Sequence, residues 1–497
     1  MSTSAGDGSQ RTAPVLPNVI FFTDNGHGLG HLTRLMAVAR KAGGEFNPVF
    51  LTMSLGFPLL EEFGFRFEYF PSYMILDMSR ARWDPLLLSR LTELVEATKA
   101  RSVVVDHISP PRSFGWLRDR LDTVDFIWCR RGLWKEDRNR EGVIRAREFD
   151  LVVEPADIAA PLDSGFTSEY RRGVRSVPPI VLVEPQDLLP RHEAREALDV
   201  PTNATAVLIQ LTDSDPETLE HMIAHTRSVI AERVNGELSC FAPLHPLHGG
   251  GLSDIAGVAM KPIYPVARYL KAFDGVVSTA GYNSFHEVII SGVPAVFVPR
   301  ATNSVDDQER RARFAELCGR AYWAPSVEAE EFRDAIHCML EPDEPDIAAE
   351  TARGLGPMNG AGALARIVSD RISGRRDQQG LRLKSVTQPP GRNWQYSHLK
   401  GDADVVLVEA FATTEASLRS ALESLGAHEG QGNELPVVMA DDTHADLLIS
   451  LGVPFETVMR EADWSTVDSG LAYRAYIDQR TSRAYQRYGA SRTLRLV

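Results

Sequence analysis

Two segments far apart in the chain combine residue types that could bind a phosphorylated ligand. One is NGHGLGH at 25–31, directly after the apolar run 19–22, and the other is STAGYNSFHE at 278–287, directly after 275–277. Each pattern predicts a buried strand, a tight turn of small residues and a helix start. Free backbone amides and the helix dipole at such a turn receive an anion, commonly a phosphate. The two segments therefore predict an enzyme that closes two halves of the chain around a phosphorylated ligand.

The second segment also places a carboxylate on one face of the expected helix. Gly281, Ser284 and Glu287 follow one another at intervals of three residues and share that face, while the apolar residues between and after them take the opposite, buried face. A carboxylate at Glu287 can accept hydrogen bonds from ribose hydroxyls, as an acid does in dinucleotide-binding folds. The alternative is that Glu287 is a solvent-exposed helix residue and Gly281 an ordinary turn glycine.

Short apolar runs that alternate with helical patterns predict the elements that position these residues. In the N-terminal part, five continuous apolar runs predict buried strands, at 19–22, 48–51, 102–105, 125–128 and 150–153. Residues 30–41 carry apolar side chains at helical spacing, which predicts a helix against this sheet. Continuous apolar strands with helices between them are typical of a parallel sheet that is covered on both faces.

The α/β pattern pauses at a proline-rich crossover, 178–199, and then starts again. The second set of predicted strands lies at 206–211, 238–241, 258–262, 275–277 and 294–298. We therefore predict an α/β fold with a disordered tail at 1–16, an N-terminal Rossmann-like lobe at 17–180, a second Rossmann-like lobe at 181–373, a linker at 374–399 and a small accessory α/β domain at 400–497. Alternatively, Trp394, Tyr396 and the region 473–488 pack back onto the first lobe.

Composition narrows the classes of function. The chain has 497 residues, a net charge of −14 and a pI near 5.5, without a run of Lys and Arg, which argues against a nucleic-acid binder. No apolar stretch is long enough for a membrane helix, and the polar N-terminus lacks the features of a signal peptide. The four cysteines are scattered and fit neither a disulfide framework nor a zinc site. We therefore predict a cytoplasmic protein with buried thiols and no metal.

The motifs resemble those of GT-B glycosyltransferases, most closely family 28, which includes the peptidoglycan lipid-linked N-acetylglucosaminyltransferases. A Gly-rich first loop that ends in His matches 26–31, and the signature G-[AY]-x-[ST]-x-x-E matches 281–287. A small-Gly-x-Pro strand and a D-Q-x-x-[NR]-A element match 291–299 and 307–312. The resemblance covers about residues 17–372 and not the C-terminal segment. It implies two Rossmann-like lobes, of which the first binds the acceptor and the second binds a nucleotide sugar.

His31 is the candidate base, because it lies at a helix start beside Gly28 and Gly30, where a small backbone lets a ligand approach. A neutral imidazole there could take a proton from an acceptor hydroxyl, or from water, as that oxygen attacks the anomeric carbon. The alternative is a histidine that only hydrogen-bonds the loop or the ligand phosphate. Asp106, at the end of a strand, could orient His31, bind the acceptor or simply form a turn. Arg34, one turn after His31, could contact a ligand phosphate or pair with an acid.

On the donor side, the resemblance implies that the turn 279–281 holds the diphosphate and that Asp307 and Gln308 contact the donor sugar. Alternatively, Asp306 or Asp307 caps a helix. The loop 211–216 departs from the family, because it has two acids and no glycine where a Gly-rich phosphate loop is usual. Either Thr212 and Ser214 donate to phosphate, or the diphosphate rests mainly on the turn 279–281. The candidate nucleotide-sugar-binding residues are Gly28, Gly30, Arg34, Thr212, Thr279, Ala280, Gly281, Ser284, Glu287, Asp307 and Gln308.

These residues predict an inverting, metal-independent glycosyltransferase that uses a nucleotide-diphosphate sugar, with UDP as the expected nucleotide, and needs no cofactor. A helix N-terminus can stabilise the departing diphosphate without a metal ion. One alternative is a nucleotide-sugar hydrolase on the same fold, which the string 26–34 also resembles. Another is a sugar-nucleotide-binding scaffold without catalysis, which the acidic loop and the added domain favour. The expected partners are the donor and an unknown acceptor, with a second copy or another protein able to bind through the C-terminal domain.

Overall fold

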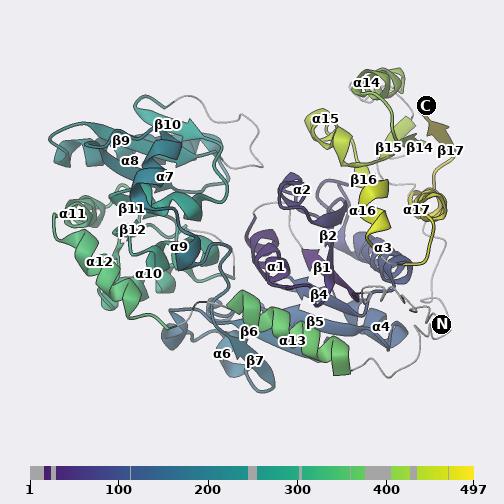
Figure 1. The fold of residues 1–497 in the computed structure, drawn as a ribbon, viewed down its shortest axis with the longest axis horizontal. Coiled ribbons are helices and arrows are strands. Elements are labelled where there is room, and N and C mark those ends of the chain that lie inside the picture. The colour runs from purple at the N-terminus through teal and green to yellow at the C-terminus, as the bar shows by residue number, and fades with distance from the viewer. Residues whose placement is uncertain are drawn as a thin grey trace, which may run out of the picture.

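The computed structural model of this chain contains three parallel β-sheets with helices packed against them (Figure 1). It describes residues 16–23, 29–111, 113–244, 255–300, 305–356, 358, 360–374, 404–425, 434–467 and 469–496. The first two sheets form two α/β lobes, and the third belongs to the C-terminal part of the chain, beside the first lobe. Within these residues, no helix is both long and apolar enough to cross a membrane.

The first lobe is built on a seven-stranded sheet with the order β3-β2-β1-β4-β5-β6-β7. Its strands are β1 (Asn18–Thr23), β2 (Asn47–Thr52), β3 (Arg66–Tyr69), β4 (Ser102–Asp106), β5 (Asp125–Cys129), β6 (Leu151–Pro155) and β7 (Val174–Val177). Its helices are α1 (Gly30–Arg40), α2 (Pro58–Glu62), α3 (Arg80–Thr98), α4 (Ser113–Arg120), α5 (Arg140–Ile144) and α6 (Phe166–Glu169). Every residue of β1, β4 and β5 is buried, which is why these strands are continuous apolar runs in the sequence.

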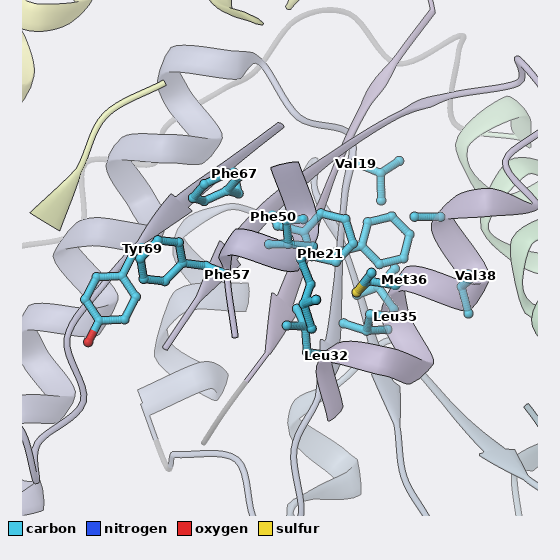
Figure 2. Packing of buried hydrophobic residues seen from close by; sticks show 14 of the residues in the cluster. Val19, Phe21, Leu32, Leu35, Met36, Val38, Phe50, Phe57, Phe67 and Tyr69 are labelled. Atoms are coloured by element: carbon cyan, nitrogen blue, oxygen red, sulfur yellow. The ribbon is translucent and has the colours of Figure 1, made fainter. Parts of the chain in front are cut away.

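Helix α1 covers one face of this sheet through a stripe of apolar side chains (Figure 2). Leu32, Leu35 and Met36 are fully buried against the rings of Phe21 on β1 and Phe50 on β2. The two rings stack with 5.5 Å between their centroids. Because the three side chains recur at helical spacing, their burial fixes the rotation of α1 about its axis and therefore the direction of its first turn.

The second lobe is built on a six-stranded sheet with the order β10-β9-β8-β11-β12-β13. Its strands are β8 (Thr205–Gln210), β9 (Leu238–Pro243), β10 (Val258–Lys261), β11 (Gly275–Ser278), β12 (Ala295–Phe297) and β13 (Tyr322–Trp323). Its helices are α7 (Arg191–Leu198), α8 (Pro216–Arg233), α9 (Tyr282–Ser291), α10 (Gln308–Leu317), α11 (Glu330–Met339) and α12 (Glu344–Arg353). The expected strands of this lobe are therefore present, and β13 adds a short edge strand.

Both lobes reverse their strand order between the first and the fourth strand of the lobe. In the first lobe β1 lies beside β4, with Thr23 opposite Asp106. In the second lobe β8 lies beside β11, with Gln210 opposite Ser278. Open parallel sheets bind ligands outside the carboxyl ends of their strands at such a reversal, because the two adjacent loops diverge there and leave a crevice. The topology thus puts the turn after Ser278 and the loop after Asp106 at the two ligand-binding edges.

The chain returns to the first lobe through α13 (Gly360–Gly374), which runs along that lobe in Figure 1. Leu364 and Val368 are buried in the core of the first lobe, and Arg371 pairs with Asp125 of β5. The helix starts against the crossover between the lobes, where the Gly360 amide donates to the Pro179 carbonyl at 3.1 Å. The last helix of the segment 181–373 therefore stabilises the first lobe and not the second.

The C-terminal part forms its own four-stranded sheet with the order β16-β15-β14-β17. Its elements are β14 (Asp404–Ala410), α14 (Glu415–Ser424), β15 (Glu434–Ala440), α15 (Ala445–Leu451), β16 (Phe455–Thr457), α16 (Glu461–Ser465), α17 (Tyr473–Tyr488) and β17 (Arg492–Arg495). Its edge strand β16 meets the edge strand β3 of the first lobe. There the Tyr69 amide donates to the Thr457 hydroxyl at 2.6 Å, and the rings of Tyr69 and Phe455 stack at 4.7 Å.

A buried network of charges joins this sheet to the first lobe. Its members are Glu68, Arg90 and Glu93 of the first lobe and Glu456, Arg480 and Arg487 of the C-terminal part, all buried. Arg480 and Arg487 of α17 reach Glu456 at 3.0 and 2.8 Å, and Tyr476 donates to Glu68 at 2.6 Å. Equal numbers of both signs leave the network neutral, which burial requires. Helix α17 thus packs against the first lobe, whereas Trp394 and Tyr396 lie outside the described residues.

We expect Glu456→Gln to destabilise the protein by about 3–5 kcal/mol at pH 7, because two buried guanidiniums would lose the carboxylate between them. Burial alone would raise the pKa of Glu456, but Arg487 and Arg480 hold it at about 2. In the parent protein this contribution is therefore complete above the ordinary pKa of a glutamate and is lost as the pH falls through 2. Urea unfolding at a series of pH values measures it, and the difference between parent and variant should close in acid.

Glu434→Gln is the matched control, since its ion pair with Arg492 in the same sheet is exposed to solvent. That substitution should cost less than about 1 kcal/mol at any pH. A Glu456→Gln protein as stable as the parent at pH 7 would contradict the role of the network.

Candidate functional site

His31 and Asp106 meet at the ligand-binding edge of the first lobe. His31 lies in the first turn of α1 and Asp106 ends β4, and the His31 Nδ1 is 2.6 Å from the Asp106 Oδ1. Both side chains are buried. A carboxylate can only accept a hydrogen bond, so Nδ1 carries the proton and Nε2 keeps a free lone pair. No described residue contacts Nε2 with a hydrogen bond, which leaves it available to a ligand.

Arg34 lies one turn after His31 and pairs with the same carboxylate. Its Nε and Nη2 donate to Asp106 Oδ2 and Oδ1 at 2.8 and 2.7 Å. Burial alone would raise the pKa of the Asp106 carboxyl, but Arg34 and His31 hold it well below its ordinary value. Of the two roles that the sequence left open for Arg34, the structure shows the pairing with an acid.

The surroundings of His31 favour the neutral imidazole by lowering its pKa. Burial is the main cause that lowers its pKa below the ordinary value of a histidine, and Arg34 and Arg131 lower it further. Asp106 opposes the shift without reversing it. A neutral imidazole with its Nδ1 proton held by a carboxylate is arranged to accept a proton at Nε2.

On the second lobe, the turn 279–281 leads from β11 into α9. Thr279 and Ala280 are buried, and the Thr279 hydroxyl lies 3.3 Å from the Thr212 hydroxyl on the neighbouring loop. Gly281 is the N-cap of the helix and has no side chain to cap it, so among the described residues the amides of the first turn are open to an anion. Gln308 faces the same turn, because a Cβ at Gly281 would lie 4.0 Å from its Nε2.

The acidic loop after β8 is less repulsive toward phosphate than its sequence indicates. Asp213 lies 3.8 Å from the guanidinium of Arg300, which follows β12. Asp215 caps α8 by accepting from the Thr218 amide at 2.9 Å. Similarly, Asp307 caps α10 by accepting from the Arg310 amide at 3.1 Å, the role that the sequence offered as its alternative. Thr212 remains exposed beside this loop.

Glu287 lies on α9, half-buried beside the crossover that links the lobes. Burial raises the pKa of its carboxyl to about 7, and a hydrogen bond with the Leu182 backbone offsets part of this shift. A carboxyl group whose pKa is raised this far by burial is unusual for a residue with only a structural role. Ser284 lies one turn before it, also half-buried, and Gly28 lies outside the described residues.

Helix α9 also brings the two predicted segments together. Asn283 donates to the Gly30 carbonyl at 3.2 Å and accepts from Arg34 at 3.3 Å. Tyr282 donates to the Ala156 carbonyl at 2.9 Å, and His286 Nε2 accepts from the Ile158 amide at 3.1 Å. The motif 281–287 therefore supplies both the anion-binding turn and the contacts that hold this turn against the first lobe.

Sequence reasoning missed four charged residues at the junction of the lobes. Arg311 of α10 bonds Asp157 and Asp306, each at 2.9 Å, and Arg131 approaches Asp306. The available signal was position, because Arg131 and Asp157 come a few residues after the predicted strands 125–128 and 150–153 and must lie at their carboxyl ends. Within the described residues, no three His, Cys, Asp or Glu side chains are grouped to hold a metal ion.

No protein-family model and no curated protein matches the sequence. The fold, however, is similar to solved structures of glycosyltransferases. Spinosyn forosaminyltransferase SpnP is 13% identical, with a TM-score of 0.50 over 71% of this chain and 99% of that chain. Spinosyn rhamnosyltransferase SpnG complexed with thymidine diphosphate is 15% identical, with a TM-score of 0.49. Acinetobacter baumannii MurG is also 15% identical, with a TM-score of 0.45. Both alignments cover 71% of this chain and 99% of the other chain. The predicted α/β fold is therefore confirmed as the GT-B fold of glycosyltransferases, with two Rossmann-like lobes.

Proposed function

We propose that the chain is an inverting glycosyltransferase that moves a sugar from a nucleotide-diphosphate sugar to an acceptor hydroxyl. The observation that carries this proposal is the buried His31–Asp106 pair, in which His31 Nε2 has no hydrogen bond from a described residue. This pair belongs to the first lobe, and the turn 279–281 at the start of α9 belongs to the second. In-line displacement at an anomeric carbon needs a base on one side and an anion-stabilising group on the other. A GT-B fold supplies these two groups from separate lobes that meet at the bound donor.

In the proposed reaction, His31 Nε2 takes the proton of the acceptor hydroxyl as its oxygen bonds to the anomeric carbon. The bond from that carbon to the diphosphate breaks on the opposite face, and the electron pair leaves with the diphosphate. Asp106 stays ionised and stabilises the imidazolium that forms, since its pKa is held well below neutrality. The amides of the α9 first turn and the Thr279 hydroxyl stabilise the departing charge, so the proposal needs no metal ion.

We propose UDP as the nucleotide, with the ribose hydroxyls on Glu287 and the sugar against Gln308. Binding experiments should also include thymidine diphosphate, because the structure of the similar protein SpnG contains it. Thermal shift identifies the donor, since a ligand that binds only the native state raises the melting temperature. Release of the nucleotide without any acceptor would indicate a hydrolase, and binding without turnover would indicate a scaffold.

We further propose that the C-terminal sheet contributes no catalytic group. It meets the first lobe at β3, the opposite edge from β7 and three strands away from β4, where Asp106 lies. Its buried network with α3 and β3 supports an accessory role in holding the first lobe in shape.

We expect His31→Ala to lower the rate of sugar transfer about 10²- to 10⁴-fold, because a general base contributes on this order. Nucleotide affinity should stay within a factor of two or so, since the nucleotide lies on the other lobe. Transfer at saturating donor and calorimetry with UDP measure the two quantities. His192→Ala, at an exposed histidine of α7, is the control. A variant that transfers sugar at the parental rate would exclude His31 as the base.

We expect Glu287→Gln to raise stability and lower nucleotide affinity at the same time. Its carboxyl has a pKa raised to about 7 by burial, so the folded state is penalised once the group ionises. Stability of the parent should fall between pH ~4.5 and 7 relative to the variant, which should be about 2–3 kcal/mol more stable at pH 8. Its affinity for UDP should fall by about 1–3 kcal/mol through the lost charged hydrogen bonds to ribose.

Urea unfolding and calorimetry at pH 8 measure the two effects, with Glu350→Gln on the exposed face of α12 as the control. Unchanged UDP affinity in Glu287→Gln would remove Glu287 from the nucleotide site.

A further inference from the structure

Arginines and aspartates of both lobes converge where the lobes join. Two of the arginines are fully committed to protein partners. Arg34 holds Asp106 with two hydrogen bonds. Arg311 bonds Asp306 at 2.9 Å, a carboxylate of the first lobe at 2.9 Å and the Ala280 carbonyl at 2.6 Å. Neither Arg34 nor Arg311 therefore has a pair of guanidinium N–H groups available for a ligand.

Arg131 differs from both. Among the described residues, its charged contact is a 3.6 Å approach of Nη1 to Asp306, which is too long for a hydrogen bond. That carboxylate is already held by Arg311. The Arg131 Nε is buried and has no hydrogen-bond partner within the part of the chain that the structure describes. An unpaired buried donor is costly, so a close acceptor for this guanidinium would be favourable.

The position of Arg131 says which ligand could supply that acceptor. It follows β5, whose neighbour β4 ends at Asp106, with Asp106 opposite Cys129. It lies close enough to His31 to disfavour the charged imidazole. Its Nη1 approaches Asp306, which directly precedes Asp307 and Gln308, and we proposed Gln308 as a contact of the donor sugar. The side chain is 13% exposed, so a ligand between the lobes can reach it.

We propose that Arg131 binds an oxyanion of the ligand, either the diphosphate of the donor or a carboxylate on its sugar. The inference rests on the proposed function and adds a specificity-determining residue to it. A guanidinium presents two parallel N–H groups that match both kinds of oxyanion, and such charged hydrogen bonds are the strong ones. Binding would also give the Arg131 guanidinium a close anionic partner, which Asp306 at 3.6 Å does not provide.

The test compares ligands with and without the anion in the intact protein. Calorimetry with uridine, UDP, UDP-glucose, UDP-glucuronate and inorganic pyrophosphate, and with thymidine and its diphosphate in parallel, is run on the parent, Arg131→Ala and Arg131→Lys. Arg138→Ala, at an exposed arginine of the same segment, is the control. Arg311 still holds Asp306 in the Arg131 variants, so no carboxylate is orphaned, and melting temperatures check this.

We expect Arg131→Ala to weaken UDP and pyrophosphate about 10- to 100-fold and uridine less than about twofold, with Arg131→Lys recovering part of the loss. If the anion is instead on the sugar, the loss appears only in UDP-glucuronate relative to UDP-glucose. Equal losses for uridine and the charged ligands, or no loss at all, would overturn the inference. A parent protein that binds neither UDP nor thymidine diphosphate refutes the proposed function. Pyrophosphate binding then tests the role of Arg131 separately. Weaker pyrophosphate binding in Arg131→Ala supports that role, whereas equal binding in both proteins, or no binding at all, overturns it.

Discussion

The buried ion pair between Arg34 and Asp106 is the interaction on which the rest of the site depends. It ties α1 to the end of β4 through two hydrogen bonds, and the same carboxylate receives His31 Nδ1. A lone buried carboxylate would take up a proton, but beside Arg34 it stays ionised and can fix the imidazole ring. Arg34 also reaches Asn283 on the second lobe. The Arg34 guanidinium therefore links the orientation of the proposed base to the position of the second lobe against the first.

Balanced charge is a recurring solution in this protein. The junction of the lobes and the interface with the C-terminal sheet both bury arginines together with carboxylates. In each network at least one pair joins different units of the chain, Arg311 with Asp157 and Arg487 with Glu93. Such networks contribute little net stability against apolar packing, but they penalise every arrangement that separates the partners. They therefore fix how the units fit together. The net charge of −14 then resides outside these two interfaces.

Helix α9 shows how one motif serves two purposes. Its uncapped first turn offers amides to a ligand, while Tyr282, Asn283 and His286 bond the backbone and side chains of the first lobe. The spacing of Gly281, Ser284 and Glu287 leaves these other positions free for the lobe contact. A change at the contact face would therefore shift the anion-binding turn relative to His31, which is a geometric constraint on the whole motif.

The sequence by itself determined most of the strands, the helices between them and the small-residue turn at 279–281, because apolar periodicity and glycine placement act over a few residues. It did not predict the short edge strands β3, β7, β13, β16 and β17. It also put His31, Asp106 and the 279–281 turn at strand ends, where a parallel sheet binds ligands. Only the tertiary structure decided that Arg34 pairs with Asp106, that Asp213 lies against Arg300, that Arg131 approaches Asp306 only at 3.6 Å and that α17 packs on the first lobe. Arg34 and Asp106, for example, are 72 positions apart in the sequence. Ion-pair and hydrogen-bond partners depend on which strands become neighbours in the sheets. A local sequence pattern does not specify that order.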